Sequence, residues 1–178
     1  MRGIVSRVFP PIFSVHGFWT FWSELMKSFW RGEFFWHGKP MVHPVLDNFY
    51  IISSTGLLLL AAGAWLKDRK TSDADISVWS SVILSVLSLV WLSASFDYGR
   101  SVYPSKEAPY FTSGRLIAGA LVPFLILYIN GIAFLLRKLS RVAAPLLFVV
   151  LTIVAITVSE VVLSTPVFSS PYNWFHLP

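Results

Sequence analysis

Four long apolar segments alternate with short polar segments along the chain, and this pattern determines the fold class. They cover residues 49–66, 76–96, 116–136 and 142–163, and none carries a charge in its central third. Each holds about 18–22 residues, the length that a helix needs to cross a hydrocarbon layer of roughly 30 Å. A backbone in lipid must satisfy its own hydrogen bonds, and these segments are too long for barrel strands. The pattern therefore predicts four transmembrane helices.

A different periodicity occupies residues 14–30. Large apolar residues recur there at spacings of three and four, which predicts an amphipathic helix. They are Val15, Phe18, Trp19, Trp22, Leu25, Met26, Phe29 and Trp30. An aromatic apolar face opposite a mixed polar face suits a helix that lies in the membrane interface. A helix packed on the other spans is the alternative, and both interpretations stay open at this point.

The predicted fold class is an all-α integral membrane protein with four transmembrane helices and an N-terminal amphipathic interfacial helix. We expect an aromatic-rich interfacial or extracytoplasmic segment at 1–47, a four-helix transmembrane domain at 48–164 and an extracytoplasmic tail at 165–178. A chain of 178 residues is long enough for one compact four-helix unit and too short for two.

Glycines and prolines inside the spans predict where helices approach closely or bend. Gly56 and Gly63 of the first span would permit close helix contact. Pro123 lies inside the third span, where its ring frees the carbonyl of Gly119, so we expect a kink. Pro145 falls in the first turn of the fourth span and is tolerated there.

Two polar features bear on how the spans begin and pack. Ser72 lies three residues before Asp75, the spacing of a capping box at the start of the second span. Asn130 is an amide in the middle of the third span, and we interpret it as a helix–helix hydrogen bond.

Basic residues predict the orientation. The short connections 67–75 and 137–141 each hold three Lys or Arg, so both should face the cytoplasm. The N-terminal segment, the connection 97–115 and the C-terminal tail then lie outside. Aromatic residues make up 16% of the chain, and many flank the spans, where amphipathic rings settle at the headgroup level.

Composition narrows the partners and the chemistry. The chain has no Cys, which excludes disulfides and thiolate metal sites. Its net charge of +5 indicates attraction to anionic lipid headgroups, so membrane lipids are expected partners. Nucleic acid is not an expected partner, because no basic stripe is separate from the membrane signal.

The strongest candidate site is a polar cluster at the outer level of the spans. Its members are Asp97, Arg100, Tyr110, Arg115 and Glu160. Glu160 is the only acidic residue embedded in an apolar run, about one turn before the predicted end of its span. A carboxylate there costs roughly 2–3 kcal/mol unless it is paired or hydrated, so we expect Arg115, or secondly Arg100, as its partner. One interpretation is an ion pair that locks two helices. The other is an anion or lipid-phosphate site, since an Arg fork and tyrosine hydroxyls suit a phosphate.

A second constellation comprises Glu33, His37, His43 and Asp47. The first two and the last two are each four residues apart, and all four side-chain types ligate transition metals. A glycine and a proline between them break the helix that would align all four. Ordinary interfacial hydrogen bonding is the favoured interpretation, and we predict no metal and no cofactor.

Three stretches together resemble a known group of proteins. They are SFWRGEFFWHGKP at 28–40, PYFTSGRLIAGALVPFLILY at 109–128 and SSPYNWFHLP at 169–178. In this order they resemble the C-terminal part of large bacterial polytopic membrane proteins related to the C-type glycosyltransferases, which use lipid-linked sugars. The resemblance implies a location in the bacterial inner membrane.

One element of that group opens a late span after an extracytoplasmic loop. Gly114, Arg115, Leu116 and, further on, Pro123 match it here. The group's catalytic carboxylate, expected in the first extracytoplasmic loop, has no counterpart in this chain. We therefore expect the closing part of such a protein standing alone, as a subunit or as a remnant.

Three functions follow from these observations. The first is a non-catalytic integral membrane subunit that packs on and stabilises a larger membrane complex, with other membrane subunits as partners and no enzymatic activity of its own. The alternative is a component of a polyprenyl-phosphate-sugar-dependent glycosyltransferase that binds the lipid phosphate at the outer face. A metal-dependent membrane enzyme built on the second constellation is the third. A transporter is disfavoured, because the midplane offers only Asn130 and scattered hydroxyls.

Overall fold

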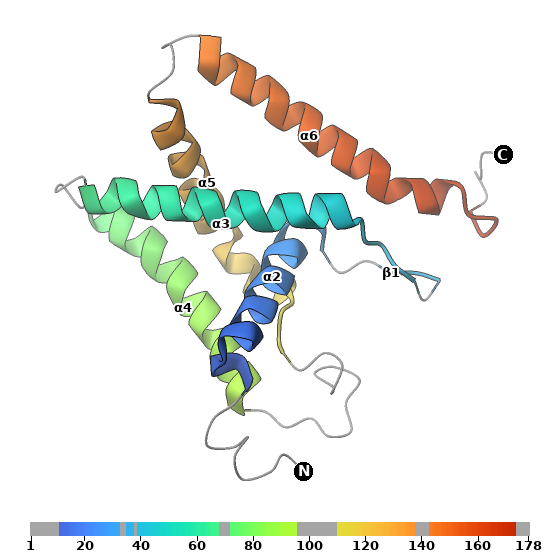
Figure 1. Cartoon of the computed structure of the whole chain (residues 1–178), viewed down its shortest axis with the longest axis horizontal. Coiled ribbons are helices and arrows are strands. Elements are labelled where there is room, and N and C mark those ends of the chain that lie inside the picture. Colours follow the sequence, from blue (N-terminus) through green and yellow to red (C-terminus); the bar gives the residue numbers. More distant parts are fainter. Residues whose placement is uncertain are drawn as a thin grey trace.

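A computed structural model describes residues 11–32, 35–37, 39–67, 72–95, 110–137 and 143–173 of the chain. The elements in order are η1 (Pro11–Phe13), α2 (Val15–Arg31), β1 (Phe35–Trp36), β2 (Lys39–Pro40), α3 (Pro44–Lys67), α4 (Asp73–Ser95), η2 (Gly114–Ala120), α5 (Leu121–Leu136) and α6 (Ala143–Phe168). β1 and β2 form one short antiparallel pair, and the rest of the ordered structure is helical (Figure 1).

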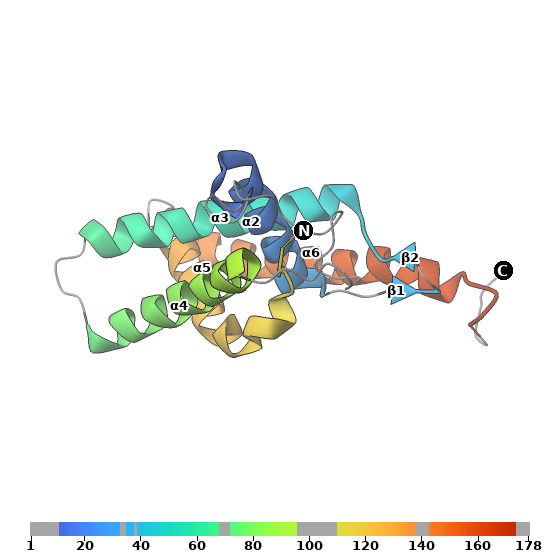
Figure 2. The same ribbon diagram turned by 90° about the horizontal axis from the view of Figure 1, so that it is seen from below.

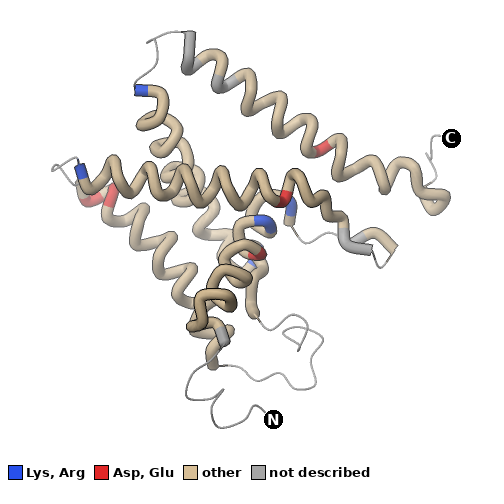
Figure 3. The backbone as a smooth tube through the Cα atoms, in the orientation of Figure 1, with Lys and Arg blue, Asp and Glu red and all other residues tan. Residues whose placement is uncertain are grey.

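Four helical stretches are long and apolar enough to cross a membrane. They are α3, α4, the joined stretch Gly114–Leu136, and Val150–Phe168 within α6. In Figure 3 the bodies of α3, α4 and α5 are free of blue and red, and their charges lie near the helix ends. The predicted all-α membrane fold with four spanning helices is thereby confirmed.

The spans fan out instead of forming a parallel bundle. In Figures 1 and 2, α3 and α4 diverge from a shared end. α6 touches α3 through the hydroxyls of Ser159 and Tyr50 and lies apart from α4 (Figure 1). α3 and α5 make the most extensive contact, while α2 and η2 pack beside them. The hydrophobic core lies where these four elements and α4 meet. Its most buried large side chains are Ile12, Phe21, Leu25, Met26, Leu89 and Phe124.

One glycine sets the approach of α3 and α5. A Cβ atom at Gly131 of α5 would collide with the backbone carbonyl of Leu57 in α3. At Gly56 and Gly63 a Cβ atom would meet nothing within 4 Å, so the prediction of close contact at these two positions is wrong. Small residues let helix backbones approach in membranes, but the contact needs one on only one of the two helices.

The third span is distorted, as its proline predicts. It begins as the 3-10 helix η2 and becomes α-helical at Leu121. Ile117 departs most from helical geometry, with φ −120° and ψ 32°. Pro123 therefore sits in the first turn of α5, where its missing N–H removes no α-helical hydrogen bond. The kink takes the form of a 3-10 segment on the N-terminal side of the proline.

α6 is longer than predicted. It continues through Pro166 to Phe168, five residues beyond the expected end at 163. Thr165 supports this end, because its hydroxyl donates to the Val161 carbonyl and its own carbonyl accepts from the Ser169 N–H. Pro166, in the last turn, therefore does not end the helix.

Two helix starts carry side-chain caps. Ser14 accepts a hydrogen bond from the Gly17 N–H at the start of α2, at 3.0 Å. Ser72 and Asp75 form the reciprocal box that their spacing predicts. The Asp75 N–H donates to the Ser72 hydroxyl, and the Ser72 N–H donates to the Asp75 carboxylate, both at 3.2 Å.

α2 is amphipathic and packs on the spans. Phe21, Leu25 and Met26 are fully buried against the rest of the chain, while Val15 and Phe18 remain exposed. Of the two placements that the sequence left open, packing on the spans therefore holds for one face of the helix. The N-terminal half still presents apolar surface of the kind that suits an interface.

We predict that Gly131→Ala weakens the contact between α3 and α5. The added methyl group collides with backbone, which cannot move aside cheaply, so we expect a loss of about 1–3 kcal/mol in unfolding free energy. Thermal unfolding of the detergent-solubilised protein, followed by circular dichroism, measures this loss. Gly63→Ala is the matched control and should melt like the wild type. Equal melting temperatures for the two variants would show that the contact does not limit stability.

Candidate functional site

The structure does not assemble the predicted outer cluster into one site. Arg115 is exposed on η2, whereas Glu160 is exposed on α6, which stands apart. Among the described residues, Glu160 takes part in no ion pair and no hydrogen bond, so the expected Glu160–Arg115 pair is not formed. The ion pairs recorded within the described ranges lie elsewhere, at α2. Asp97 and Arg100 lie outside the described residues.

Tyr110 packs in the hydrophobic core. Only 7% of it is exposed, and it belongs to the hydrophobic core together with Ile117 and Phe124. The next residue, Phe111, anchors the segment, because its N–H donates to the Ser93 hydroxyl of α4 at 2.9 Å. The tyrosine ring thus holds the segment before η2 against the spans.

The second predicted constellation is also divided. Asp47 binds Arg31, and His37 stacks on an aromatic ring of the C-terminal turn. His43 is partly buried, and Glu33 lies outside the described residues. Within the part of the chain that the structure describes, no three His, Asp or Glu residues are grouped to hold a metal ion.

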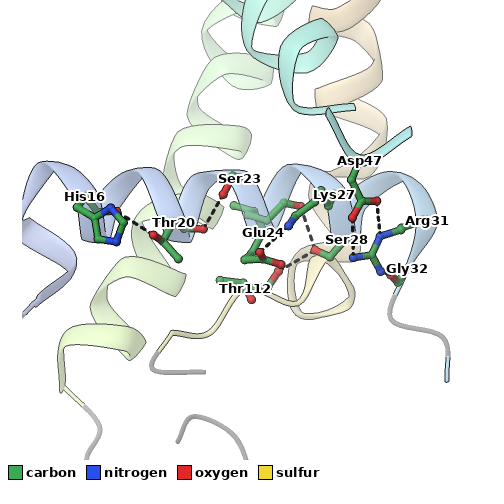
Figure 4. A network of polar contacts seen from close by, with 11 residues as sticks. His16, Thr20, Ser23, Glu24, Lys27, Ser28, Arg31, Gly32, Asp47 and Thr112 are labelled. Atoms are coloured by element: carbon green, nitrogen blue, oxygen red, sulfur yellow. Dashed lines mark hydrogen bonds and ion pairs between the residues drawn. The ribbon is translucent and has the colours of Figure 1, made fainter. Parts of the chain in front are cut away.

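A hydrogen-bonded ion pair joins α2 to α3. Arg31 in the last turn of α2 meets Asp47 in the first turn of α3 (Figure 4). The guanidinium Nε lies 2.8 Å from Oδ1, and Nη2 lies 3.4 Å from Oδ2. The two side chains are only 11% and 13% exposed. A cation at a helix C-terminus and an anion at a helix N-terminus each oppose the local helix dipole, so this fork stabilises both helix ends.

A serine joins α2 to η2. The Ser28 hydroxyl donates to the Thr112 carbonyl at 2.7 Å and accepts from the Gly114 N–H at 2.8 Å. A Cβ atom at Gly114 would lie 3.0 Å from the Phe29 nitrogen, so only glycine allows this approach without a shift. Figure 4 shows the Thr112 segment passing directly beside Ser28.

Two tryptophans of α2 form further hydrogen bonds with α3. The indole N–H of Trp22 donates to the Thr55 hydroxyl at 2.8 Å, and that of Trp30 donates to the Ser54 hydroxyl at 2.7 Å. The Trp30 ring also packs on Tyr50 and Phe124. Buried indoles need a hydrogen-bond partner, and here hydroxyls of the first span supply it.

The contacts of α2 with α3 and with the segment 112–114, together called the α2 joint, serve to hold the fold. Its guanidinium, carboxylate, hydroxyl and indole groups are all engaged inside the chain. Sequence analysis placed Asp47 in a metal constellation and did not single out Arg31 or Ser28. Two signals pointed to the joint: the tryptophans on the apolar face of α2, and the hydroxyl run 53–55 in an otherwise apolar span.

Glu160 of the predicted outer cluster lies well inside a span. It lies eight residues before the end of α6, about 12 Å along the helix at a rise of 1.5 Å per residue. The adjacent Ser159 faces α3, where its hydroxyl is hydrogen-bonded to that of Tyr50. Successive residues project about 100° apart around a helix, so the Glu160 carboxylate points away from that contact. The exposed face of α6 around Glu160 is the candidate interaction site.

We predict that Ser28→Ala destabilises the fold. It leaves the Thr112 carbonyl and the Gly114 N–H without their buried partner, which costs about 1–3 kcal/mol in unfolding free energy. Ser23→Ala is the control, because the Ser23 hydroxyl donates only within α2, to the Thr20 carbonyl. Chemical denaturation in mixed micelles compares the two. If both variants unfold like the wild type, the serine does not hold η2 in place.

Comparisons with protein-family models, with curated proteins and with solved structures found no match.

Proposed function

We propose that the chain is a non-catalytic integral membrane subunit that packs on a larger membrane complex through α6 and stabilises it. The observation that carries this proposal is Glu160, an exposed carboxylate well inside a membrane-spanning helix. A charged side chain near the centre of a span costs roughly 2.5–3.5 kcal/mol on insertion scales, and intramembrane carboxylates normally face a partner. The structure gives Glu160 none among the described residues. A neighbouring subunit with a Lys or Arg at this depth would offset that cost.

The attachment of α6 supports the same proposal. Among the described elements, α6 forms no extensive contact with another helix. Its contacts with the rest of the chain include the hydroxyl pair of Tyr50 and Ser159 and the stacking of Tyr172, just beyond the helix, on His37. Large apolar side chains around the helix are exposed, including Leu151, Ile156 and Val161. α6 can therefore accept another transmembrane helix without disturbing the core of α2, α3 and α5.

The partner that fits is a transmembrane helix of a different protein. A second copy of this chain would bring another Glu160 into an isologous contact, and two carboxylates facing each other in lipid repel one another. In this proposal the protein lies in a bacterial inner membrane. The connections after α3 and after α5 face the cytoplasm, and both termini lie outside, as the density of basic residues indicates.

Glu160→Gln tests the proposal. The change keeps the shape of the side chain and removes its charge, so we expect at least tenfold weaker association, equivalent to about 1.4 kcal/mol or more. Native mass spectrometry after gentle solubilisation measures the fraction of the chain that carries a stoichiometric partner. Thr157→Val is the control, because the Thr157 hydroxyl donates to the Ile153 carbonyl of its own helix. A wild-type protein that emerges as a stable monomer, or a Glu160→Gln variant that keeps its partner, would contradict the proposal.

The second candidate function is a glycosyltransferase component that binds a polyprenyl phosphate at the outer face. The exposure of Arg115 at the start of η2 favours it, because a guanidinium at the end of a span can bind a lipid phosphate. It matches the position of the arginine in the group that the sequence resembles.

Arg115→Ala distinguishes this candidate from the first. We expect at least tenfold weaker binding of a short polyprenyl phosphate in detergent, and thermal unfolding checks that the variant is folded. Lys67→Ala, an exposed cation at the other end of the spans, is the control. Binding that survives Arg115→Ala would exclude a phosphate site at this position.

A further inference from the structure

A cavity of about 210 Å³ lies between α3, α4 and α5. It sits near the level where α3 ends, α4 begins and α5 ends. A cavity of roughly 10–15 Å³ holds one water, and sites for drug-sized ligands begin near 300 Å³. The space therefore suits a group with a handful of heavy atoms, such as a lipid headgroup at the end of the spans.

Small residues create the space. α3 contributes Ala61, Ala64 and Trp65, which share one helix face at spacings of three and four. α5 contributes Ala133 opposite them. These three methyl side chains are too short to fill the space between the helices, whereas Gly131 lets α3 and α5 come into contact further along.

Polar groups line part of the cavity. Asp75 and Arg137 carry the charges, and Asn130 and Trp65 add an amide and an indole N–H. The indole N–H of Trp65 is buried and has no hydrogen-bond partner among the described residues. Asn130 makes no hydrogen bond within the described ranges, so the expected helix–helix bond is not formed and its amide faces the cavity instead. A buried indole N–H is normally paired, so its state here indicates a ligand or water that accepts from it.

The two charges lie on different walls of the cavity. Asp75, on α4, uses one carboxylate oxygen, Oδ2, to bind Ser72 in the capping box, while Oδ1 accepts no hydrogen bond from the described part of the chain. Arg137 lies at the end of α5, and the described residues form no ion pair between it and Asp75. The cavity is therefore lined by a carboxylate, a guanidinium and an indole N–H.

We propose that this cavity binds the phosphoethanolamine headgroup of a membrane lipid. The phosphate accepts hydrogen bonds from the Arg137 guanidinium and the Trp65 indole, and the primary ammonium donates to Asp75 Oδ1. The ring of Trp79 lies 6.0 Å from that of Trp65 and adds an aromatic wall beside the ammonium. The acyl chains extend along the exposed apolar surface of the spans. This inference is independent of the subunit proposal, because no residue of α6 lines the cavity.

Headgroup selectivity of the wild-type protein is the first test. Native mass spectrometry with added phosphatidylethanolamine, phosphatidylglycerol or phosphatidylcholine reports binding of each. We expect the ethanolamine lipid to bind at least tenfold more tightly than the other two, because glycerol lacks the cation and choline cannot donate to a carboxylate. Equal binding of the three lipids would overturn the proposal. Free phosphoethanolamine that binds as tightly as the lipid would overturn the assignment to a lipid.

Variants then assign the groups. Asp75→Asn keeps an acceptor for the capping box and should abolish the preference for ethanolamine over glycerol. Arg137→Gln should weaken the binding of both phosphatidylethanolamine and phosphatidylglycerol at least tenfold, since both lipids carry the phosphate. Lys67→Gln is the control at the same end, because Lys67 is exposed and does not line the cavity.

Melting temperatures equal to that of the wild type confirm that each variant folds. If a variant fails to fold, Trp65→Phe, which removes only the indole N–H donor and part of the ring, should lower the affinity for the ethanolamine lipid. Unchanged headgroup binding in all folded variants would rule the cavity out. Glu160→Gln should leave lipid binding intact, so failure of the subunit proposal and failure of this one are distinguishable.

Discussion

The backbone contact between α3 and α5 is the constraint on which the rest of the structure depends. Gly131 carries no side chain, so the backbone of α5 can approach the Leu57 carbonyl of α3. Without a hydrophobic force between helices in lipid, such close packing is a main source of association. α2 packs on this pair through α3, and η2 leads directly into α5. The cavity lies beyond this contact, where short alanine side chains of the same two helices leave space unfilled.

The second layer of organisation is polar, and it serves packing. Arg31 and Asp47 fasten the end of α2 to the start of α3, and Ser28 fastens α2 to the segment before α5. Both contacts join elements that lie far apart in sequence or are separated by a turn, so they hold the topology. The charged and polar groups at this level of the molecule are used internally. The polar groups of the other two sites, the α6 face and the cavity, take no part in these contacts.

The sequence predicted features that depend on local physics. The presence of four spans, the capping box of Ser72 and Asp75, and the distortion near Pro123 follow from hydrophobicity, backbone hydrogen bonding and proline geometry within single segments. Contacts between segments were not predictable in this way. Gly56 and Gly63 were expected to allow close packing and Gly131 was not considered, because only the rotation of α3 relative to α5 decides which glycine meets backbone. The prediction that Arg115 pairs with Glu160 was wrong for the same reason, since depth in the membrane does not specify which helices are neighbours.

The loose attachment of α6 has a consequence for the life of the protein in a cell. α6 finds little surface of its own chain on which to settle, apart from the hydroxyl contact with Tyr50. Under the proposed function, a copy without its partner would hold its carboxylate against lipid until assembly. Cells continuously remove poorly folded chains through chaperones and proteases, so cellular levels of this protein would then track the supply of the subunit that covers α6.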